Sequence, residues 1–161
     1  MGRPAPIDQQ HVADLARPFG SSRTLPAAAY TSPEVHAWER SEIFDRTWVC
    51  LGRTDDLLAP GQVRGVDHGD ESVLLTRDAG GAVRGFSNVC RHRGHTLVEP
   101  GEAIDARLVR CPYHSWSYRL DGSLRSAPTL TQPSIMGTGD FDTEDWPLSA
   151  VGVDDLMGWL F

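Results

Sequence analysis

The sequence has few of the features that mark membrane, secreted or nucleic-acid-binding proteins. No stretch approaches the roughly eighteen consecutive apolar residues that a membrane-spanning helix needs. The first twenty residues contain neither an apolar signal-peptide core nor a twin arginine. The net charge of −7 disfavours nucleic acid and anionic membrane surfaces as partners. We therefore expect a cytoplasmic protein with no nucleic-acid partner and no membrane partner.

Cysteine is also scarce, because the chain has only Cys50, Cys90 and Cys111. Three cysteines give no disulfide framework and predict a reducing compartment. Cys50 stands in the apolar run Trp48–Leu51, where a free thiol is expected to be buried like a small hydrophobic side chain. The other two cysteines each stand close to a histidine and are candidates for metal ligands.

Two Cys/His pairs carry the strongest chemical signal in the sequence. They are Cys90-Arg-His92 and Cys111-Pro-Tyr-His114, and eighteen residues separate them. Structural zinc sites usually group ligands of one kind, as in C-x(2–4)-C or H-x(3–5)-H. One thiolate and one imidazole from each of two loops is instead the donor set of a Rieske-type [2Fe-2S] cluster. A zinc site, or buried thiols beside surface imidazoles, remains the alternative. His11, His36, His68 and His95 match no ligand position.

The residues around both pairs resemble the Rieske domain of bacterial ring-hydroxylating oxygenase alpha subunits and of their amine-oxidising relatives. The resemblance rests on Asn88-Val-Cys90-Arg-His92-Arg-Gly94, on Cys111-Pro-Tyr-His114-Ser-Trp116-Ser-Tyr118 and on Leu120-Asp-Gly122, and it runs from about Leu25 to the end. Two features depart from the family pattern. Ser115 stands where the family usually has glycine, and the segment between the pairs is about one residue longer than usual.

The resemblance implies that Cys90, His92, Cys111 and His114 bind one [2Fe-2S] cluster that relays single electrons. A reductase or ferredoxin would supply the electrons, and a mononuclear Fe(II) in the catalytic domain of the same or a neighbouring subunit of a homotrimer would receive them. High-potential Rieske proteins have a serine where this chain has Trp116, so we expect a potential near the low end of the range of about −150 to +300 mV. Tyr118 could still donate one hydrogen bond.

The catalytic iron itself is not expected in this sequence. Its usual ligands are two histidines and a carboxylate, and no histidine follows His114. We therefore expect no catalytic residues here and interpret the sequence as the electron-entry part of an oxygenase subunit. The alternatives are a freestanding Rieske ferredoxin and, less favoured, a zinc-stabilised interaction module.

Local signals predict an all-β fold with an N-terminal helix. Residues 1–24 are polar and unpatterned, which predicts an extended or poorly ordered arm. Ser32-Pro33 predicts a helix start, with the helix ending near Phe44. These residues form an expected N-terminal segment 1–45 before a Rieske domain at 46–161. Short strands between glycines and prolines predict an antiparallel sandwich or barrel, with a cluster-binding subdomain of two hairpin loops. The expected strands are 47–51, 72–77, 82–89, 107–110, 117–120, 123–125, 148–153 and 157–161, and 127–147 is expected to be a surface loop.

Overall fold

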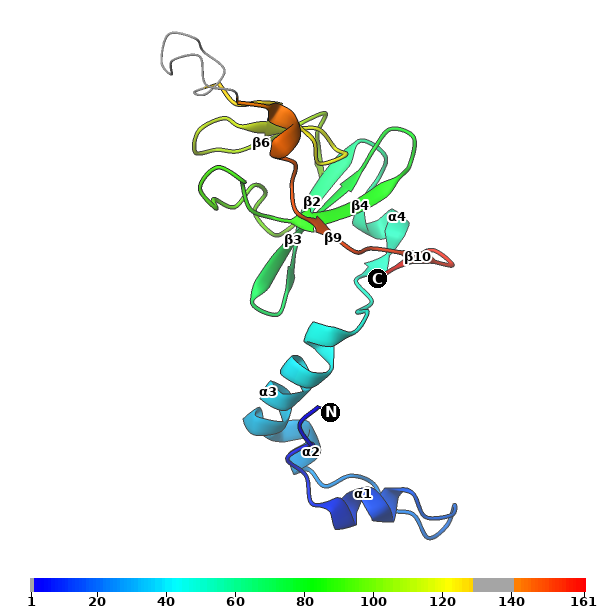
Figure 1. Cartoon of the computed structure of the whole chain (residues 1–161). Coiled ribbons are helices and arrows are strands. Elements are labelled where there is room, and N and C mark those ends of the chain that lie inside the picture. Colours follow the sequence, from blue (N-terminus) through cyan, green and yellow to red (C-terminus); the bar gives the residue numbers. More distant parts are fainter. Residues whose placement is uncertain (1, 129–140) are drawn as a thin grey trace. The chain divides into compact units, whose positions relative to one another are not determined.

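The computed structural model describes residues 2–128 and 141–161, which form two compact units, Met1–Val49 and Cys50–Phe161. Figure 1 shows helices in the first unit and antiparallel strands in the second. Within the described ranges, no helix has the length and apolar character needed to cross a membrane.

The N-terminal unit is more regular than its sequence suggests. It contains α1 (Gln9–Leu15), α2 (Ala28–Thr31), α3 (Pro33–Glu42) and the 3-10 helix η1 (Phe44–Arg46). The prediction of an extended arm is therefore wrong for α1, whose start is capped by Asp8 accepting a hydrogen bond from the Gln10 backbone N–H at 2.8 Å. The start of α3 at Pro33 is as expected, although the Ser32 side chain makes no capping bond.

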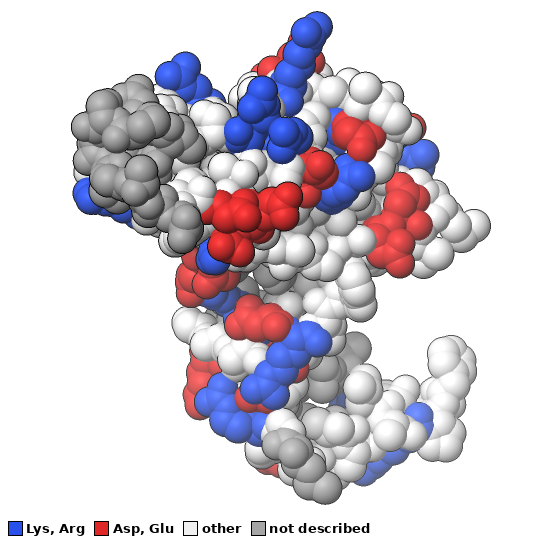
Figure 2. Space-filling model, turned by 45° about the horizontal axis from the view of Figure 1, so that its top comes forward, with Lys and Arg blue, Asp and Glu red and all other residues white. Residues whose placement is uncertain are grey.

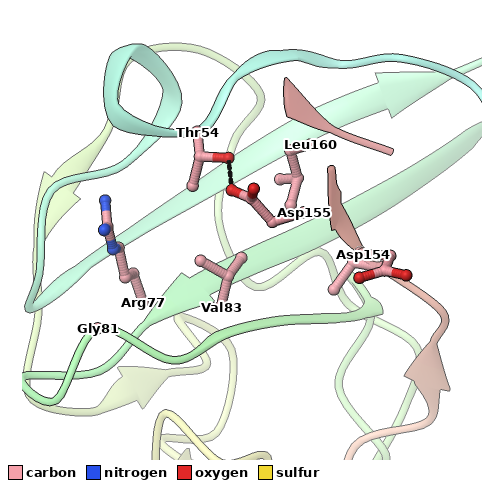
Figure 3. Close-up of a pocket in the computed structure, with 8 residues that line it drawn as sticks. Thr54, Arg77, Gly81, Val83, Asp154, Asp155 and Leu160 are labelled. Carbon is pink, nitrogen blue, oxygen red and sulfur yellow. Dashed lines mark hydrogen bonds between the residues drawn. The ribbon is translucent and has the colours of Figure 1, made fainter. Parts of the chain in front are cut away.

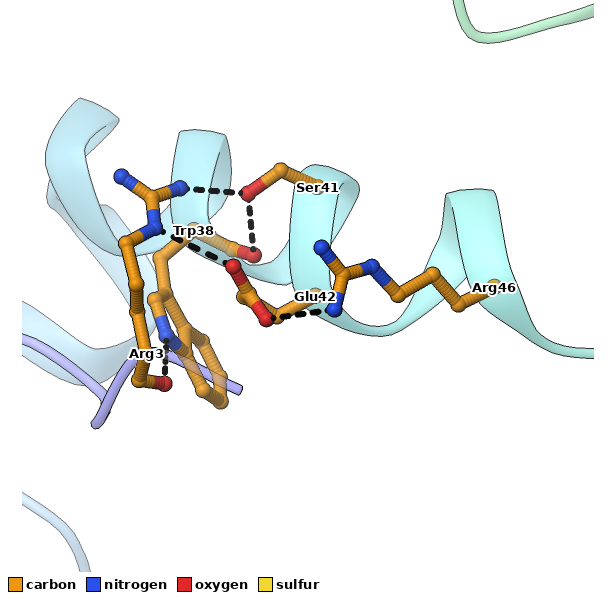
Figure 4. A network of polar contacts seen from close by, with 5 residues as sticks. All are labelled: Arg3, Trp38, Ser41, Glu42 and Arg46. Atoms are coloured by element: carbon orange, nitrogen blue, oxygen red, sulfur yellow. Dashed lines mark hydrogen bonds and ion pairs between the residues drawn. The ribbon is translucent and has the colours of Figure 1, made fainter. Parts of the chain in front are cut away.

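The residues before α1 are bound to α3 by a polar network (Figure 4). The Trp38 indole N–H donates to the Arg3 carbonyl at 2.7 Å, and the Arg3 guanidinium contacts Ser41 at 2.7 Å and Glu42 at 3.1 Å. Arg46 reaches the second oxygen of Glu42 at 3.0 Å. The hydrogen bond from Arg3 is the main reason why the pKa of Glu42 lies below its ordinary value. This network gives the start of the chain a defined position on α3.

The Cys50–Phe161 unit is built from three antiparallel sheets. Its main sheet has the strand order β5-β2-β3-β4-β9, and two smaller sheets have the orders β1-β11-β10 and β6-β7-β8. The all-β prediction is confirmed. The elements are β1 (Gly52–Arg53), α4 (Thr54–Leu57), β2 (Gln62–His68), β3 (Glu71–Arg77), β4 (Val83–Ser87), β5 (Ile104–Asp105), β6 (Val109–Arg110), β7 (Ser117–Tyr118), β8 (Leu124–Ser126), the 3-10 helix η2 (Thr143–Asp145), β9 (Ala150–Val151), β10 (Asp155–Leu156) and β11 (Trp159–Leu160).

Strand β3 is buried on both faces of the main sheet, which explains its continuous apolar character. Neighbouring side chains of a strand point to opposite faces. Leu74 packs into a core that contains Tyr118 of β7, whereas Leu75 packs into a second core that contains Leu160 of β11. Both leucines are fully buried. The two small sheets therefore cover opposite faces of β3, and the β7 side carries the candidate metal ligands.

Several strand predictions need correction. The segment 47–51 forms no strand, and Cys50 is exposed rather than buried. The apolar residues of 47–51 have no partner strand, because strand pairing with β11 begins at Gly52, which lies opposite Leu160. β2 was not predicted at all, although it pairs with β3 along its whole length. The surface-loop prediction for 127–147 lies largely outside the described residues, since its centre, 129–140, is not described.

A hydrogen bond connects the C-terminal hairpin β10–β11 to α4 beside a polar hollow (Figure 3). The Thr54 hydroxyl hydrogen-bonds to the Asp155 carboxylate, whose other oxygen accepts the Gly158 backbone N–H at 2.9 Å. Beside them, Arg77 bonds to Asp55 at 2.7 Å. The bond from Thr54 is the main cause that lowers the pKa of Asp155. These contacts hold Leu160 in the second core.

Candidate metal centre

The two ligand loops have the same backbone hydrogen-bond pattern. In the first, the Cys90 N–H donates to the carbonyl five residues ahead at 2.8 Å, and the Gly94 N–H returns to the Cys90 carbonyl at 2.9 Å. In the second, the Cys111 N–H donates to the Trp116 carbonyl at 2.8 Å, and the Ser115 N–H returns to the Cys111 carbonyl at 3.0 Å. Each cysteine therefore opens a one-turn loop that also contains its histidine.

The turn of each loop needs one residue with positive φ. Gly94 has a φ of 66° and Ser115 has a φ of 62°, and for residues other than glycine this left-handed region costs roughly 1–2 kcal/mol. The structure thus gives a physical reason why glycine suits position 115. Here the Ser115 hydroxyl accepts a hydrogen bond from Arg110 of β6 at 2.8 Å, which partly offsets the strain.

Asn88 holds the first loop closed from the inside. It is fully buried, and its amide nitrogen donates to the Val98 carbonyl at 2.6 Å and to the Ser72 hydroxyl at 3.0 Å. Its amide oxygen accepts the Val98 N–H at 3.1 Å. A Cβ at Gly65 would lie 2.6 Å from the same Val98 carbonyl, so only glycine lets β2 approach this closely. Asn88 and Gly65 together fix the base of the loop that carries Cys90.

The two candidate histidine ligands lie side by side. The ring centroids of His92 and His114 are 4.7 Å apart, and the rings are inclined by 66°. Each ring has a buried Nδ1 atom that finds no hydrogen-bond partner among the described residues. A buried nitrogen of this kind is costly unless something binds it. Burial is the main cause that lowers the pKa of His92, which favours the neutral imidazole that a metal requires.

The two candidate thiolate ligands form a second pair. Cys90 and Cys111 are both buried. Burial raises the pKa of the Cys90 thiol, and the neighbouring Cys111 thiol raises it further. The Tyr118 hydroxyl lies 3.3 Å from the Cys90 sulfur and accepts the Arg91 N–H at 3.1 Å. Since burial also raises the pKa of Tyr118, its hydroxyl stays protonated and can donate to that sulfur, as expected from the sequence.

Aromatic side chains cover the histidine pair. The indole of Trp116 is stacked on His92 with centroids 4.9 Å apart and planes 2° from parallel. Phe141 and Trp146 pack edge-on against this indole at 5.7 and 5.8 Å. Trp116 is almost completely buried, so it belongs to the core and shields His92 at the same time. Tyr113 packs against the second histidine, His114, with ring centroids 3.7 Å apart.

The donor set fits a two-iron cluster. The donors come as a thiol pair and an imidazole pair, and among the described residues no three Cys, His, Asp or Glu side chains are grouped to hold one metal ion. In a Rieske [2Fe-2S] centre, two cysteines and two histidines provide two protein ligands to each iron. The four residues selected from the sequence thus form one thiol pair and one imidazole pair, to which each of the two loops contributes one member. The two unpartnered Nδ1 atoms are the positions through which the imidazoles would bind.

Other selected residues lie outside the donor set. The His95 side chain is exposed, and its Nδ1 lies 2.7 Å from the Thr96 carbonyl. Arg91 and Arg93 are exposed beside the first loop. No role for Asn88 was predicted from the sequence, because a single buried amide has no local signature; its position two residues before Cys90 was the available signal.

Comparison with known proteins agrees with this geometry. The Rieske [2Fe-2S] domain family matches residues 47–146. The chain is 38% identical over 149 residues, 92% of its length, to a glycine betaine monooxygenase oxygenase subunit of Chromohalobacter salexigens, and 32% identical over 86% of its length to a carnitine monooxygenase oxygenase subunit of Acinetobacter baumannii. It covers 32% and 36% of these two proteins, so it spans about a third of the curated relatives it matches.

A solved structure gives the same result for the fold. The crystal structure of naphthalene 1,2-dioxygenase from Rhodococcus sp. superimposes with a TM-score of 0.76 and 31% sequence identity, over 94% of this chain and 33% of that one. The fold, the paired donors and the family match agree. The chain belongs to the Rieske [2Fe-2S] domain family, in the form found in the oxygenase subunits of Rieske oxygenases.

Proposed function

We propose that Cys90, His92, Cys111 and His114 bind the Rieske cluster and that this domain relays single electrons within an oxygenase. The observation that carries the proposal is the pair of buried, unpartnered imidazole nitrogens beside two buried thiols. When bound, the cluster supplies a one-electron couple whose potential depends on ligand charge and on hydrogen bonds to sulfur. Neutral imidazoles on one side and thiolates on the other distribute the ligand charge unequally.

The surrounding residues have separate tasks in this proposal. Tyr118 donates a hydrogen bond to the Cys90 sulfur and thereby stabilises its negative charge. Trp116 excludes water from one face of His92. Asn88 keeps the first loop closed on its base. With one side-chain donor to a cysteine sulfur among the described residues, we expect the midpoint potential to lie in the lower part of the Rieske range.

The test is anaerobic reconstitution with iron and sulfide. We expect a coloured protein with acid-labile sulfide and, after reduction, a paramagnetic resonance signal of low average g value. Cys90→Ser and His92→Ala should each abolish the signal. Cys50→Ser and His95→Ala are matched controls, because this cysteine and this histidine side chain are exposed outside the donor set, and they should retain it. Zinc binding without sulfide would establish the structural zinc site instead.

We propose further that the domain acts within a larger oxygenase. It would take electrons from a reductase or ferredoxin and pass them to a mononuclear iron in the catalytic domain of the same or a neighbouring subunit of a cytoplasmic homotrimer. The lengths of the relatives support this arrangement, since they exceed this chain about threefold. Because these relatives oxidise glycine betaine and carnitine, a quaternary amine is the first substrate class to assay. Light scattering on the complete oxygenase subunit tests the trimer.

A further inference from the structure

Four arginines line a hollow of about 550 Å³ beside the β6-β7-β8 sheet: Arg84, Arg107, Arg119 and Arg125. Leu108, which is 43% exposed, lies in the same lining. Figure 2 shows blue basic side chains and red acidic side chains in separate patches on the surface, with a blue group beside a red band near the top of the view. The hollow is separate from the four cluster ligands, which do not line it.

The charge around this hollow is opposite to that of the whole chain. Its lining contains four arginines and two aspartates, a local excess of two positive charges, in a chain with a net charge of −7. All fifteen cationic residues of the sequence are arginines. The planar guanidinium bonds carboxylates in bidentate fashion more readily than lysine does. The hollow is therefore suited to an acidic surface.

Two of the four arginines bond to neighbouring side chains, and the other two take no part in those two interactions. Arg84 pairs with Asp78 at 2.8 Å, and Arg119 bonds to the Ser123 hydroxyl at 3.1 Å. Arg107 and Arg125 are exposed and belong to neither bond. The bonds of Arg84 and Arg119 stiffen the wall of the hollow. The exposed guanidinium groups of Arg107 and Arg125 can bind the carboxylates of a partner.

The backbone connects the hollow directly to the thiol side of the metal centre. Leu108 directly precedes β6, and Cys111 follows it three positions later, about 10 Å along an extended strand. Arg119 directly follows Tyr118, whose hydroxyl contacts the Cys90 sulfur. The histidine side is covered differently, by Tyr113 and Trp116. The segments that line the hollow therefore lead along the chain to Cys111 and Tyr118, whereas Tyr113 and Trp116, which lie against the histidine rings, are not part of its lining.

We propose that this arginine hollow is the docking surface for an acidic electron-donor protein, so that electrons enter on the thiol side and leave on the histidine side. The inference depends on the proposed function, since it assigns the donor of that same centre. An exposed leucine among charged residues matches protein interfaces, which combine apolar contacts with a polar rim.

The test measures how fast a pre-reduced, acidic plant-type [2Fe-2S] ferredoxin reduces the reconstituted protein in a stopped-flow instrument at low and high salt. Charged rims act mainly on association rates, and their effect is screened by salt. For Arg107→Glu combined with Arg125→Glu, we expect the second-order rate constant to fall at least about tenfold at low salt and to approach the wild-type value at high salt. Arg17→Glu combined with Arg23→Glu makes the same charge change in the N-terminal unit and should leave the rate within about twofold.

The outcomes separate this inference from the proposed function. If no cluster forms in the wild-type protein, the proposed function fails first. Suppose that the cluster forms and dithionite reduces it. If the rate constant with ferredoxin is then independent of salt, or changes equally in both double variants, only the docking inference is overturned. A larger effect of Arg93→Glu, beside His92, than of the hollow variants would place electron entry on the histidine side and would also overturn it. The midpoint potential of each variant is measured to confirm an intact centre.

Discussion

Replacing Asn88 with alanine should loosen the first ligand loop more than any other single change at its base. The substitution leaves the Val98 carbonyl and N–H without their side-chain partner. A buried polar group that loses its hydrogen bond costs about 1–3 kcal/mol, and Val98 is half-buried, so we expect a total loss of about 3 kcal/mol. With a urea m-value of about 2 kcal/mol/M, the unfolding midpoint should fall by about 1.5 M.

Ser72→Ala is the matched control, because it removes only one of the three bonds of Asn88. Its expected cost is about 1 kcal/mol or less. Both variants are compared by urea unfolding followed by circular dichroism, and by the rate at which the bound cluster bleaches in air. Asn88→Ala should bleach several times faster than wild type. Equal midpoints and equal bleaching rates for the two variants would refute the role given to Asn88.

Asn88→Asp tests the donor half of the same interaction. The carboxylate can still accept the Val98 N–H but faces the Val98 carbonyl with no proton to donate. Burial raises the pKa of such a carboxyl group, and its protonated form regains a donor. Since the folded pKa would exceed the unfolded one, this variant should lose less stability relative to wild type as the pH falls toward about 5. A pH-independent difference would contradict this explanation.

Three further predictions concern single contacts. Tyr118→Phe removes the hydroxyl next to the Cys90 sulfur and should lower the midpoint potential by about 40 mV for each kcal/mol by which that bond favours the reduced state, measured by a redox titration. Gly122→Ala would place a Cβ 2.4 Å from the Phe86 ring at a φ of +85°, so urea unfolding should show a loss of about 3 kcal/mol. Asp155 has a lowered pKa, so its contribution to stability is present above its ordinary pKa of 3.8 and lost as the pH falls through the folded value; Asp155→Asn should flatten this acid limb in unfolding measured at several pH values.

The donor set and its hairpins could be predicted because their signals are local. The pairs Cys90/His92 and Cys111/His114 are a few residues apart, and turn residues such as Gly122 mark the hairpins directly. Strand β3 was also recognisable from its β-branched and apolar residues. These features depend on the chemistry of neighbouring residues, which a single sequence displays.

The remaining parts depend on contacts between distant residues. Cys50 was expected to be buried because its neighbours are apolar. The strand pairing that would bury it begins only two residues later, at Gly52. Strand β2 was missed because Gly65 interrupts its pattern, and the reason for that glycine is the Val98 carbonyl, thirty-three residues away. The lining of the arginine hollow combines Asp78 from the turn after β3, Arg84 of β4 and residues between 107 and 125, so its charge becomes visible only after folding. Helix α1, in contrast, had a local cap in Asp8 that the polar composition of the segment concealed.

The parallel stack of Trp116 on His92 has a consequence for the speed of electron transfer. A ring that lies flat against a buried indole, itself held by Phe141 and Trp146, has little freedom to rotate or tilt. A ligand that keeps its orientation in both oxidation states keeps the reorganisation energy small. The aromatic packing would thus let each electron arrive and depart with almost no movement of the protein.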